Sequence, residues 1–115
     1  MNDAPQNVAY DSADEPPLEI SITGPGMSET LSLVEGEYLL GRALESEIQL
    51  PDAAVSRRHA RFVTDGVTWS IEDLGSRHGT EIGGARISPN RPVPISAGER
   101  IVIRPYVIRV TGEAQ

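Results

Sequence analysis

Short segments in which apolar and polar residues alternate recur along most of the chain, and turn residues separate them. The clearest are residues 18–23 (LEISIT) and 30–34 (TLSLV), which are joined by a turn containing Gly and Pro. Alternation with a period of two is typical of β-strands with one buried face. No stretch of useful length shows the 3.6-residue period of an amphipathic helix. The pattern therefore predicts an all-β fold that begins with a β-hairpin.

Further short strands follow at regular spacing, with turn signals between them. We expect them at residues 37–41, 47–50, 58–64, 67–73, 80–82, 85–87, 100–104 and 106–110. Many short strands with frequent turns indicate a β-sandwich. In such a fold the strands form the scaffold, and the loops gathered at one end carry recognition. Loops that are distant in the sequence can therefore meet in space.

Composition limits the functions that are open to this chain. Its 115 residues fit one domain with a single core. It contains no Cys, so disulfides, thiolate metal sites and Cys nucleophiles are excluded. The net charge of −7 argues against general nucleic-acid binding, which needs a surplus of cations. All ten basic residues are Arg, the side chain best suited to bidentate contacts with carboxylate or phosphate.

The chain ends differ from the rest. Residues 1–17 are acidic, contain three Pro and no Arg, and are predicted to form a flexible tail; residues 113–115 form the C-terminal end. The first residues lack the layout of a secretory signal, and no apolar run approaches the roughly 18–20 residues of a membrane span. We therefore expect a cytoplasmic chain that makes no membrane contact through this segment.

Two segments rich in Ser, Arg and His are the candidates for a functional site: residues 55–61 (VSRRHAR) and 72–84 (EDLGSRHGTEIGG). Ser56, His59 and Asp73 supply the residue types of a hydrolase triad, but no G-x-S-x-G elbow surrounds Ser56. The two histidines, His59 and His78, would need carboxylates to complete a metal site. Both interpretations have less support than an anion site.

The residues that could form an anion site come from three separate loops. Ser56 offers a hydroxyl donor, Arg57 and Arg77 offer guanidinium groups, and Arg42 adds another from the end of an apolar strand. A phosphate has three strong acceptor oxygens and attracts several such donors. Arg58 and Arg61 are interpreted instead as solvated surface charges. Gly79 either permits a turn or lets a ligand approach closely, whereas residues 83–84 (GG) are interpreted as a turn.

At this point the motifs resemble a known family. Residues 41–42 (GR), 56–59 (SRRH) and 75–80 (GSRHGT), in this order on an all-β chain, resemble the forkhead-associated (FHA) domain. We assign residues 18–112 to it. The resemblance implies an FHA-type β-sandwich of about eleven short strands, whose recognition loops at one end bind a phosphothreonine peptide.

The resemblance also implies roles for individual residues. It assigns phosphate binding to Arg42, Ser56, Arg57 and Arg77, a peptide-contacting loop to His78, Gly79 and Thr80, and structural roles to Gly41 and His59. The chain departs from the family at His78, where an Asn that contacts the peptide backbone is usual, and at Gly83, where a second Asn is usual. A His can donate or accept a hydrogen bond and so can replace the first Asn.

The prediction is a non-enzymatic adaptor in Ser/Thr-kinase signalling, without cofactor or metal, whose partner is a phosphothreonine-containing protein or peptide. No nucleic-acid partner is expected, and of the oligomeric states a monomer is favoured. The alternative is a phospho-independent interaction or assembly module on a degenerate FHA fold. Matched phosphorylated and unphosphorylated peptides distinguish the two.

Overall fold

Strands make up all the regular secondary structure of residues 18–112, the part of the chain that the computed structural model describes. Eleven strands follow one another and no helix interrupts them, which confirms the predicted all-β fold. Their bounds are β1 Leu18–Gly24, β2 Met27–Leu33, β3 Gly36–Gly41, β4 Ile48–Gln49, β5 Ala60–Thr64, β6 Trp69–Asp73, β7 Glu81–Ile82, β8 Ala85–Arg86, β9 Val93–Ile95, β10 Arg100–Ile103 and β11 Tyr106–Gly112.

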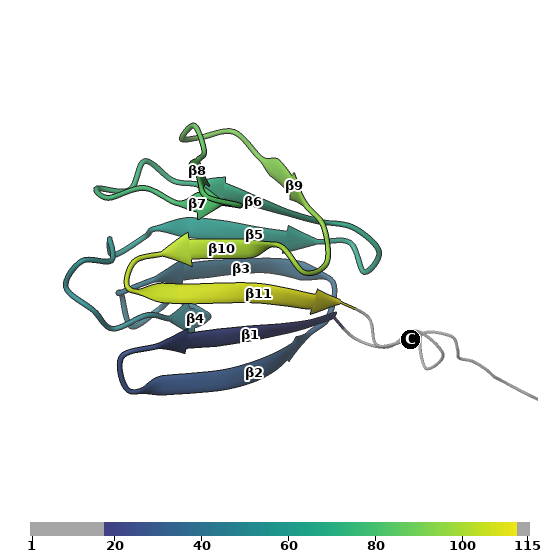
Figure 1. Cartoon of the computed structure of the whole chain (residues 1–115), viewed down its shortest axis with the longest axis horizontal. Coiled ribbons are helices and arrows are strands. Elements are labelled where there is room, and N and C mark those ends of the chain that lie inside the picture. Colours follow the sequence, from purple (N-terminus) through teal and green to yellow (C-terminus); the bar gives the residue numbers. More distant parts are fainter. Residues whose placement is uncertain (1–17, 113–115) are drawn as a thin grey trace, which may run out of the picture.

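The strands form two sheets that pack face to face. One sheet has six strands in the order β2-β1-β11-β10-β7-β8, and the other has five in the order β4-β3-β5-β6-β9. All pairings between named strands are antiparallel except that of β3 with β4. Figure 1 shows the strands of both layers running along the long axis of the molecule. The architecture is the predicted β-sandwich.

The core lies between the sheets and follows from the alternation in the sequence. Ile20 and Ile22 of β1 are buried, and so are Ile101 and Ile103 of β10. On β5, Ala60 and Phe62 are buried from the other sheet, while Arg61 between them is half-buried and faces away from the core. Most residues of the core are aliphatic, since the chain has few aromatic residues.

Turn chemistry explains how the short strands are connected. The β7–β8 turn consists of Gly83 and Gly84, which have φ angles of 60° and 88°. Two consecutive residues with positive φ are the signature of a type I′ turn, and glycine adopts this conformation without steric cost. The structure confirms the prediction of a turn at this pair. The hairpin predicted at the start of the fold is also confirmed, because β1 pairs with β2 along its whole length.

One strand, β9, was not predicted from the sequence. β9 contains Pro94 and follows Pro92, and proline argues against a strand because it lacks a backbone donor. The structure places β9 at the edge of the five-stranded sheet, where it has a neighbour on one side only. A missing N–H is tolerated at an edge, which explains the exception. The predicted tail (1–17) and C-terminal end (113–115) lie outside the described residues.

The loops that connect the strands lie at the two ends of the sandwich. The loops after β3 and β6 lie at one end of the sandwich, whereas β1 begins and β11 ends at the opposite end (Figure 1). Within residues 18–112, no helix is long and apolar enough to cross a membrane.

Candidate anion-binding site

Two of the loops at one end of the sandwich, the loop after β3 and the loop before β5, are joined through their backbones. The N–H of Arg42, which follows β3, donates to the carbonyl of Ser56 at 3.0 Å, and the N–H of Ala43 donates to the carbonyl of Arg57 at 3.2 Å. Gly41 makes this approach possible, because a Cβ at this position would overlap the carbonyl oxygen of Arg57. A side chain at residue 41 would therefore push the two loops apart.

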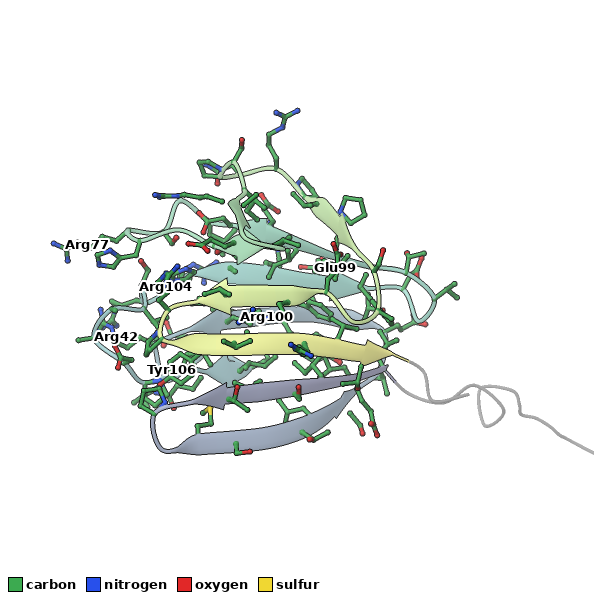
Figure 2. The ribbon with its side chains drawn as sticks, viewed as in Figure 1. Arg42, Arg77, Glu99, Arg100, Arg104 and Tyr106 are labelled. Atoms are coloured by element: carbon green, nitrogen blue, oxygen red, sulfur yellow. The ribbon has the colours of Figure 1, made fainter. Side chains whose placement is uncertain are left out.

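A cavity of about 240 Å³ opens between these loops. Four of its lining residues are the ones predicted to bind phosphate, Arg42, Ser56, Arg57 and Arg77, and the others are Ala53, Ala54 and Val55. Figure 2 shows that Arg42 and Arg77 lie at the same end of the molecule although they come from different loops. No carboxylate lines the cavity, so it combines three guanidinium groups with one hydroxyl.

The side chain of Arg42 is partly engaged by the protein. Its Nε donates a 2.9 Å hydrogen bond to the carbonyl oxygen of Val55, and the residue is half-buried. This contact fixes the plane of the guanidinium at the cavity wall. The two terminal nitrogens make no hydrogen bond to residues 18–112 and keep their donors for a ligand.

Ser56 connects the second loop to the third. Its Oγ accepts a 2.9 Å hydrogen bond from the N–H of Arg77, which leaves the hydroxyl proton to be donated elsewhere. Its own N–H donates to Nδ1 of His59 at 3.1 Å. Arg57 and Arg77 are exposed at the rim of the cavity. The arrangement holds a hydroxyl donor next to three cationic side chains.

His59 is buried and joins the loops through both ring nitrogens. Nδ1 accepts from Ser56, so Nε2 carries the proton and donates to the carbonyl oxygen of Gly79 at 2.9 Å. Burial lowers the pKa of His59 below its ordinary value, although the Gly79 carbonyl and the Asp73 carboxylate act in the opposite direction. The ring is therefore a neutral structural link between residues 56 and 79.

These contacts differ from those of a hydrolase triad. In a triad, the histidine accepts a proton from the Ser hydroxyl and donates its other N–H to the acid. Here His59 accepts from the Ser56 backbone and donates to a carbonyl, and its Nε2 is 3.9 Å from Oδ1 of Asp73. No cluster of three or more potential metal ligands occurs among residues 18–112.

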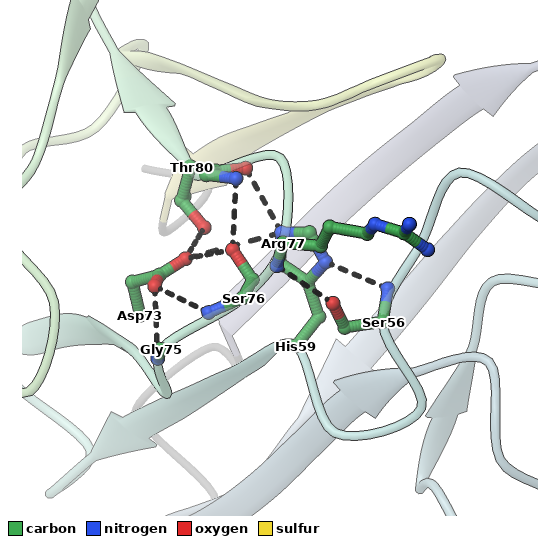
Figure 3. A network of polar contacts seen from close by, with 8 residues as sticks. Ser56, His59, Asp73, Gly75, Ser76, Arg77 and Thr80 are labelled. Atoms are coloured by element: carbon green, nitrogen blue, oxygen red, sulfur yellow. Dashed lines mark hydrogen bonds and ion pairs between the residues drawn. The ribbon is translucent and has the colours of Figure 1, made fainter.

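Asp73 organises the third loop, which follows β6 (Figure 3). Its Oδ2 accepts from the N–H groups of Gly75 and Ser76 at 3.0 and 2.9 Å. Its Oδ1 accepts from the hydroxyls of Ser76 and Thr80 at 2.6 and 2.7 Å. Burial acts to raise the pKa of Asp73, but these hydrogen bonds outweigh it and leave the pKa below its ordinary value. The carboxylate is thus an anchor for the loop.

Thr80 requires a correction. It was predicted to lie in the peptide-contacting loop, but the structure buries it completely and directs its hydroxyl to Asp73. Its side chain therefore serves the loop rather than a ligand. His78, two residues earlier, is exposed at the outer part of the same loop.

The two interpretations of Gly79 are also resolved in part. Gly79 is buried and has a φ of 87°, which favours glycine, and its N–H donates to Oγ of Ser76 at 2.9 Å. A Cβ at this position would overlap the side chain of Arg86 from β8. The positive φ is the stronger requirement for glycine, because the exposed Arg86 side chain is flexible and can move aside. Sequence reasoning missed this contact because no local signal joins the two residues.

Arg58 and Arg61 lie outside the cavity. Arg58 is exposed, as expected of a surface charge. Arg61 is half-buried on β5 and forms a 3.0 Å ion pair with Glu72, its cross-strand partner on β6. Arg61 is thus a surface charge that faces away from the core, as expected, and the adjacent strand supplies a partner for it.

Comparison with known proteins identifies the family of this arrangement. The model of the FHA domain matches residues 38–104, which is more than half of the chain. FhaB of Mycobacterium tuberculosis is 41% identical over 71 residues, a match that covers 62% of this chain and 46% of FhaB. The chain thus matches about half the length of that relative.

Solved structures give the same result. An FHA domain studied for its phosphothreonine-dependent interactions superimposes with a TM-score of 0.73 at 28% identity, covering 84% of this chain and 99% of that one. Mycobacterium tuberculosis EmbR in complex with a low-affinity phosphopeptide gives a TM-score of 0.72 at 26% identity, covering 84% of this chain and 25% of EmbR. The chain belongs to the FHA domain family.

Proposed function

We propose that this FHA domain is a phosphothreonine-peptide-binding adaptor in Ser/Thr-kinase signalling. The observation that carries the proposal is the cavity lined by Arg42, Ser56, Arg57 and Arg77, which contains donors and no carboxylate. A phosphate monoester carries a charge of about −1.5 to −2 at neutral pH and three strong acceptor oxygens. The cavity offers the complementary charge and enough donors for all three oxygens.

The contacts within the protein leave the necessary donors for this ligand. Arg42 keeps its terminal nitrogens, since only its Nε is bound to Val55. Ser56 keeps its hydroxyl proton, since its oxygen already accepts from Arg77. Charge-assisted hydrogen bonds of this kind are about twice as strong as neutral ones. Because the loops are fixed before the ligand arrives, little free energy is spent on ordering the site.

Selection of threonine over serine would depend on the apolar part of the cavity wall. Ala53 and Ala54 lie beside the cationic residues and offer surface for the γ-methyl group of threonine. Burial of one methyl group contributes about 0.8 kcal/mol, or roughly fourfold in affinity. A larger preference would require close packing of the methyl group against these two residues.

The third loop would contact the backbone of the bound peptide through His78. This side chain is exposed at the position where the family usually has Asn, and the loop that carries it is held by Asp73. A histidine ring can donate or accept a hydrogen bond through its nitrogens, as the Asn amide can. The peptide-contacting role of His78 belongs to the proposal.

The relatives support the proposal by their known ligands. One similar FHA domain takes part in phosphothreonine-dependent interactions, and EmbR was solved with a phosphopeptide. The function would be that of a binding module without catalysis. A cytoplasmic setting, where protein kinases and their substrates meet, is part of the same proposal.

An oriented phosphothreonine peptide library tests the function and its specificity together. We expect selective retention of phosphothreonine peptides over phosphoserine and unphosphorylated ones, with preferences at flanking positions. Equal retention of the unphosphorylated library would instead support the alternative, a phospho-independent interaction module. As a control, the variant Arg58→Gln should retain the same peptides as the native chain, because it removes one exposed Arg that does not line the cavity.

A further inference from the structure

A second groove lies away from the anion cavity, on the outer face of the six-stranded sheet. Its volume is about 580 Å³, and it contains two Arg and one Glu; it is lined by Glu81, Gly83, Gly84, Arg100, Val102, Arg104, Pro105 and Val107. We call this surface the basic groove. Figure 2 shows Arg100 within the sheet and Arg104 at the end nearer to Arg42 and Arg77.

The strand period explains the composition of the basic groove. Ile101 and Ile103 point into the core, so Arg100 and Val102 share the outer face of β10, and Arg104 lines the same groove from the turn that follows the strand. On the adjacent strand, Val107 is the cross-strand partner of Val102. Val102 and Val107 thus form an apolar strip between Arg100 and Arg104, which are four residues apart in the sequence. Glu81 of β7, the other cross-strand partner of Val102, lies beside this strip.

Two cations beside the groove lack a carboxylate partner in the described part of the chain, although the chain as a whole has a net charge of −7. Arg100 of β10 stands directly opposite Arg109 of β11 in the register of the sheet. No carboxylate of residues 18–112 lies within 4.0 Å of either guanidinium. Like charges in opposite cross-strand positions destabilise a sheet. The pair therefore lowers stability unless an anionic partner binds there.

Arg104 at the other end of the groove has only a weak partner. It lies 3.3 Å from Glu81 of β7, but the Arg104 side chain is 70% exposed. Exposed ion pairs contribute little free energy, so a ligand carboxylate can share or displace this contact. The same guanidinium thus remains able to receive an acid from outside.

We propose that the basic groove binds an extended acidic segment of a partner protein, of the pattern acidic–x–apolar–x–acidic. Side chains at i, i+2 and i+4 of an extended chain lie on one face. The two acids would meet Arg100 and Arg104, and the apolar residue between them would cover Val102 and Val107. This docking site is separate from the anion cavity and needs no phosphate.

The test uses the full chain and synthetic peptides without phosphate. A peptide containing Glu-Ser-Val-Ser-Glu is titrated into labelled protein and followed by NMR chemical shifts, beside a matched peptide with Lys in place of Glu. We expect shifts on β10 and β11 with the acidic peptide only, weakening as salt rises. The absence of shifts on these strands would overturn the proposal.

Two variants with the same change of charge separate a binding role from a structural one. Arg100→Gln should weaken the acidic peptide about three- to tenfold and raise the melting temperature, because it relieves the opposition to Arg109. Arg58→Gln, in an exposed loop, should leave the peptide affinity unchanged. If the two variants bind equally, or if Arg100→Gln lowers the melting temperature, Arg100 is structural and the proposal fails.

Other occupants give distinguishable results. The chain itself contains an acidic segment of the same pattern, residues 11–15 (DSADE). If the peptide binds only after Asp11, Asp14 and Glu15 are replaced by their amides, the occupant is this segment and the assignment to a partner is overturned. If the native chain sediments as a dimer and Arg100→Gln as a monomer, the occupant is a second copy, which overturns the assignment equally.

Discussion

The backbone N–H of Arg77 donates a 2.9 Å hydrogen bond to the hydroxyl oxygen of Ser56, which lies 21 residues earlier in the chain. This contact joins the loop after β6 to the loop before β5. It also occupies the hydroxyl as an acceptor, so that the hydroxyl proton is left for an anion in the cavity. One hydrogen bond thus both positions a cationic loop and prepares a donor for the phosphate.

Ser56→Ala should therefore weaken phosphothreonine-peptide binding. It removes a hydrogen bond to a charged ligand and the link to Arg77, and hydrogen bonds to charged groups contribute about 1.5–3 kcal/mol. We expect about a ten- to hundredfold loss of affinity by calorimetric titration. Ser88→Ala is the control, because Ser88 is exposed and does not line the cavity. Equal affinities of the two variants would contradict the role of Ser56.

Gly41→Ala should damage both the fold and the site. The added Cβ overlaps the carbonyl of Arg57, so the loops must separate, at a cost of about 1–3 kcal/mol in stability. Gly66→Ala is an informative control, because Gly66 has open space around it but a φ of 94°. Gly66→Ala should lose stability through backbone strain, as measured by urea unfolding. Its affinity for the peptide, as measured by titration, should be unchanged. Normal peptide binding by Gly41→Ala would show that the close contact is dispensable.

Replacement of His59 by Ala should be strongly destabilising. It leaves the N–H of Ser56 and the carbonyl of Gly79 without their partner and creates a cavity around a residue that is 1% exposed. Each unsatisfied buried group costs about 1–3 kcal/mol, so a loss of about 2–4 kcal/mol is expected in urea unfolding. His78→Ala should stay within about 0.5 kcal/mol of the native chain, because His78 is exposed. Similar losses in both variants would be incompatible with the link between the loops.

The lowered pKa of His59 predicts how stability depends on pH. The unfolded chain takes up a proton at His59 near the ordinary value of 6.5, whereas the folded chain does so only at lower pH. The stability from neutral His59 is therefore complete above about pH 6.5 and is lost as pH falls through the lowered pKa. The lowered pKa of Asp73 acts likewise in a more acidic range, below its ordinary value of 3.8.

Urea unfolding of the native chain and of His59→Gln at about pH 7.5 and 5 measures this effect, since the chain has only one other histidine. The native chain should lose more stability on acidification than the variant. If the two chains lose equal amounts, His59 does not carry the pH dependence.

The fold was largely predictable because its strands carry local signals. β1, β5 and β10 alternate so regularly that their buried faces can be assigned from sequence alone. β9 was not predictable, because the tolerance of Pro94 depends on its place at a sheet edge. An edge position is set by the packing of distant strands and leaves no mark in the local sequence.

The site was predictable in its membership but not in its internal contacts. The motif resemblance pointed to Arg42, Ser56, Arg57 and Arg77, and the structure places all four around one cavity. It did not reveal that Thr80 is buried against Asp73. Motif positions indicate which loops meet, whereas the direction of each side chain depends on neighbours that only the folded chain supplies.

Calorimetric titration of the native chain and Arg42→Ala with one library-selected peptide, in phosphorylated and unphosphorylated form, tests the central claim most directly. The native chain should bind only the phosphothreonine form. Arg42→Ala should bind it more weakly by about 1.5–3 kcal/mol, roughly ten- to a hundredfold, while Arg58→Ala binds it normally. Equal affinity for both peptides, or unchanged affinity in Arg42→Ala, would contradict a phosphate-binding cavity at this site.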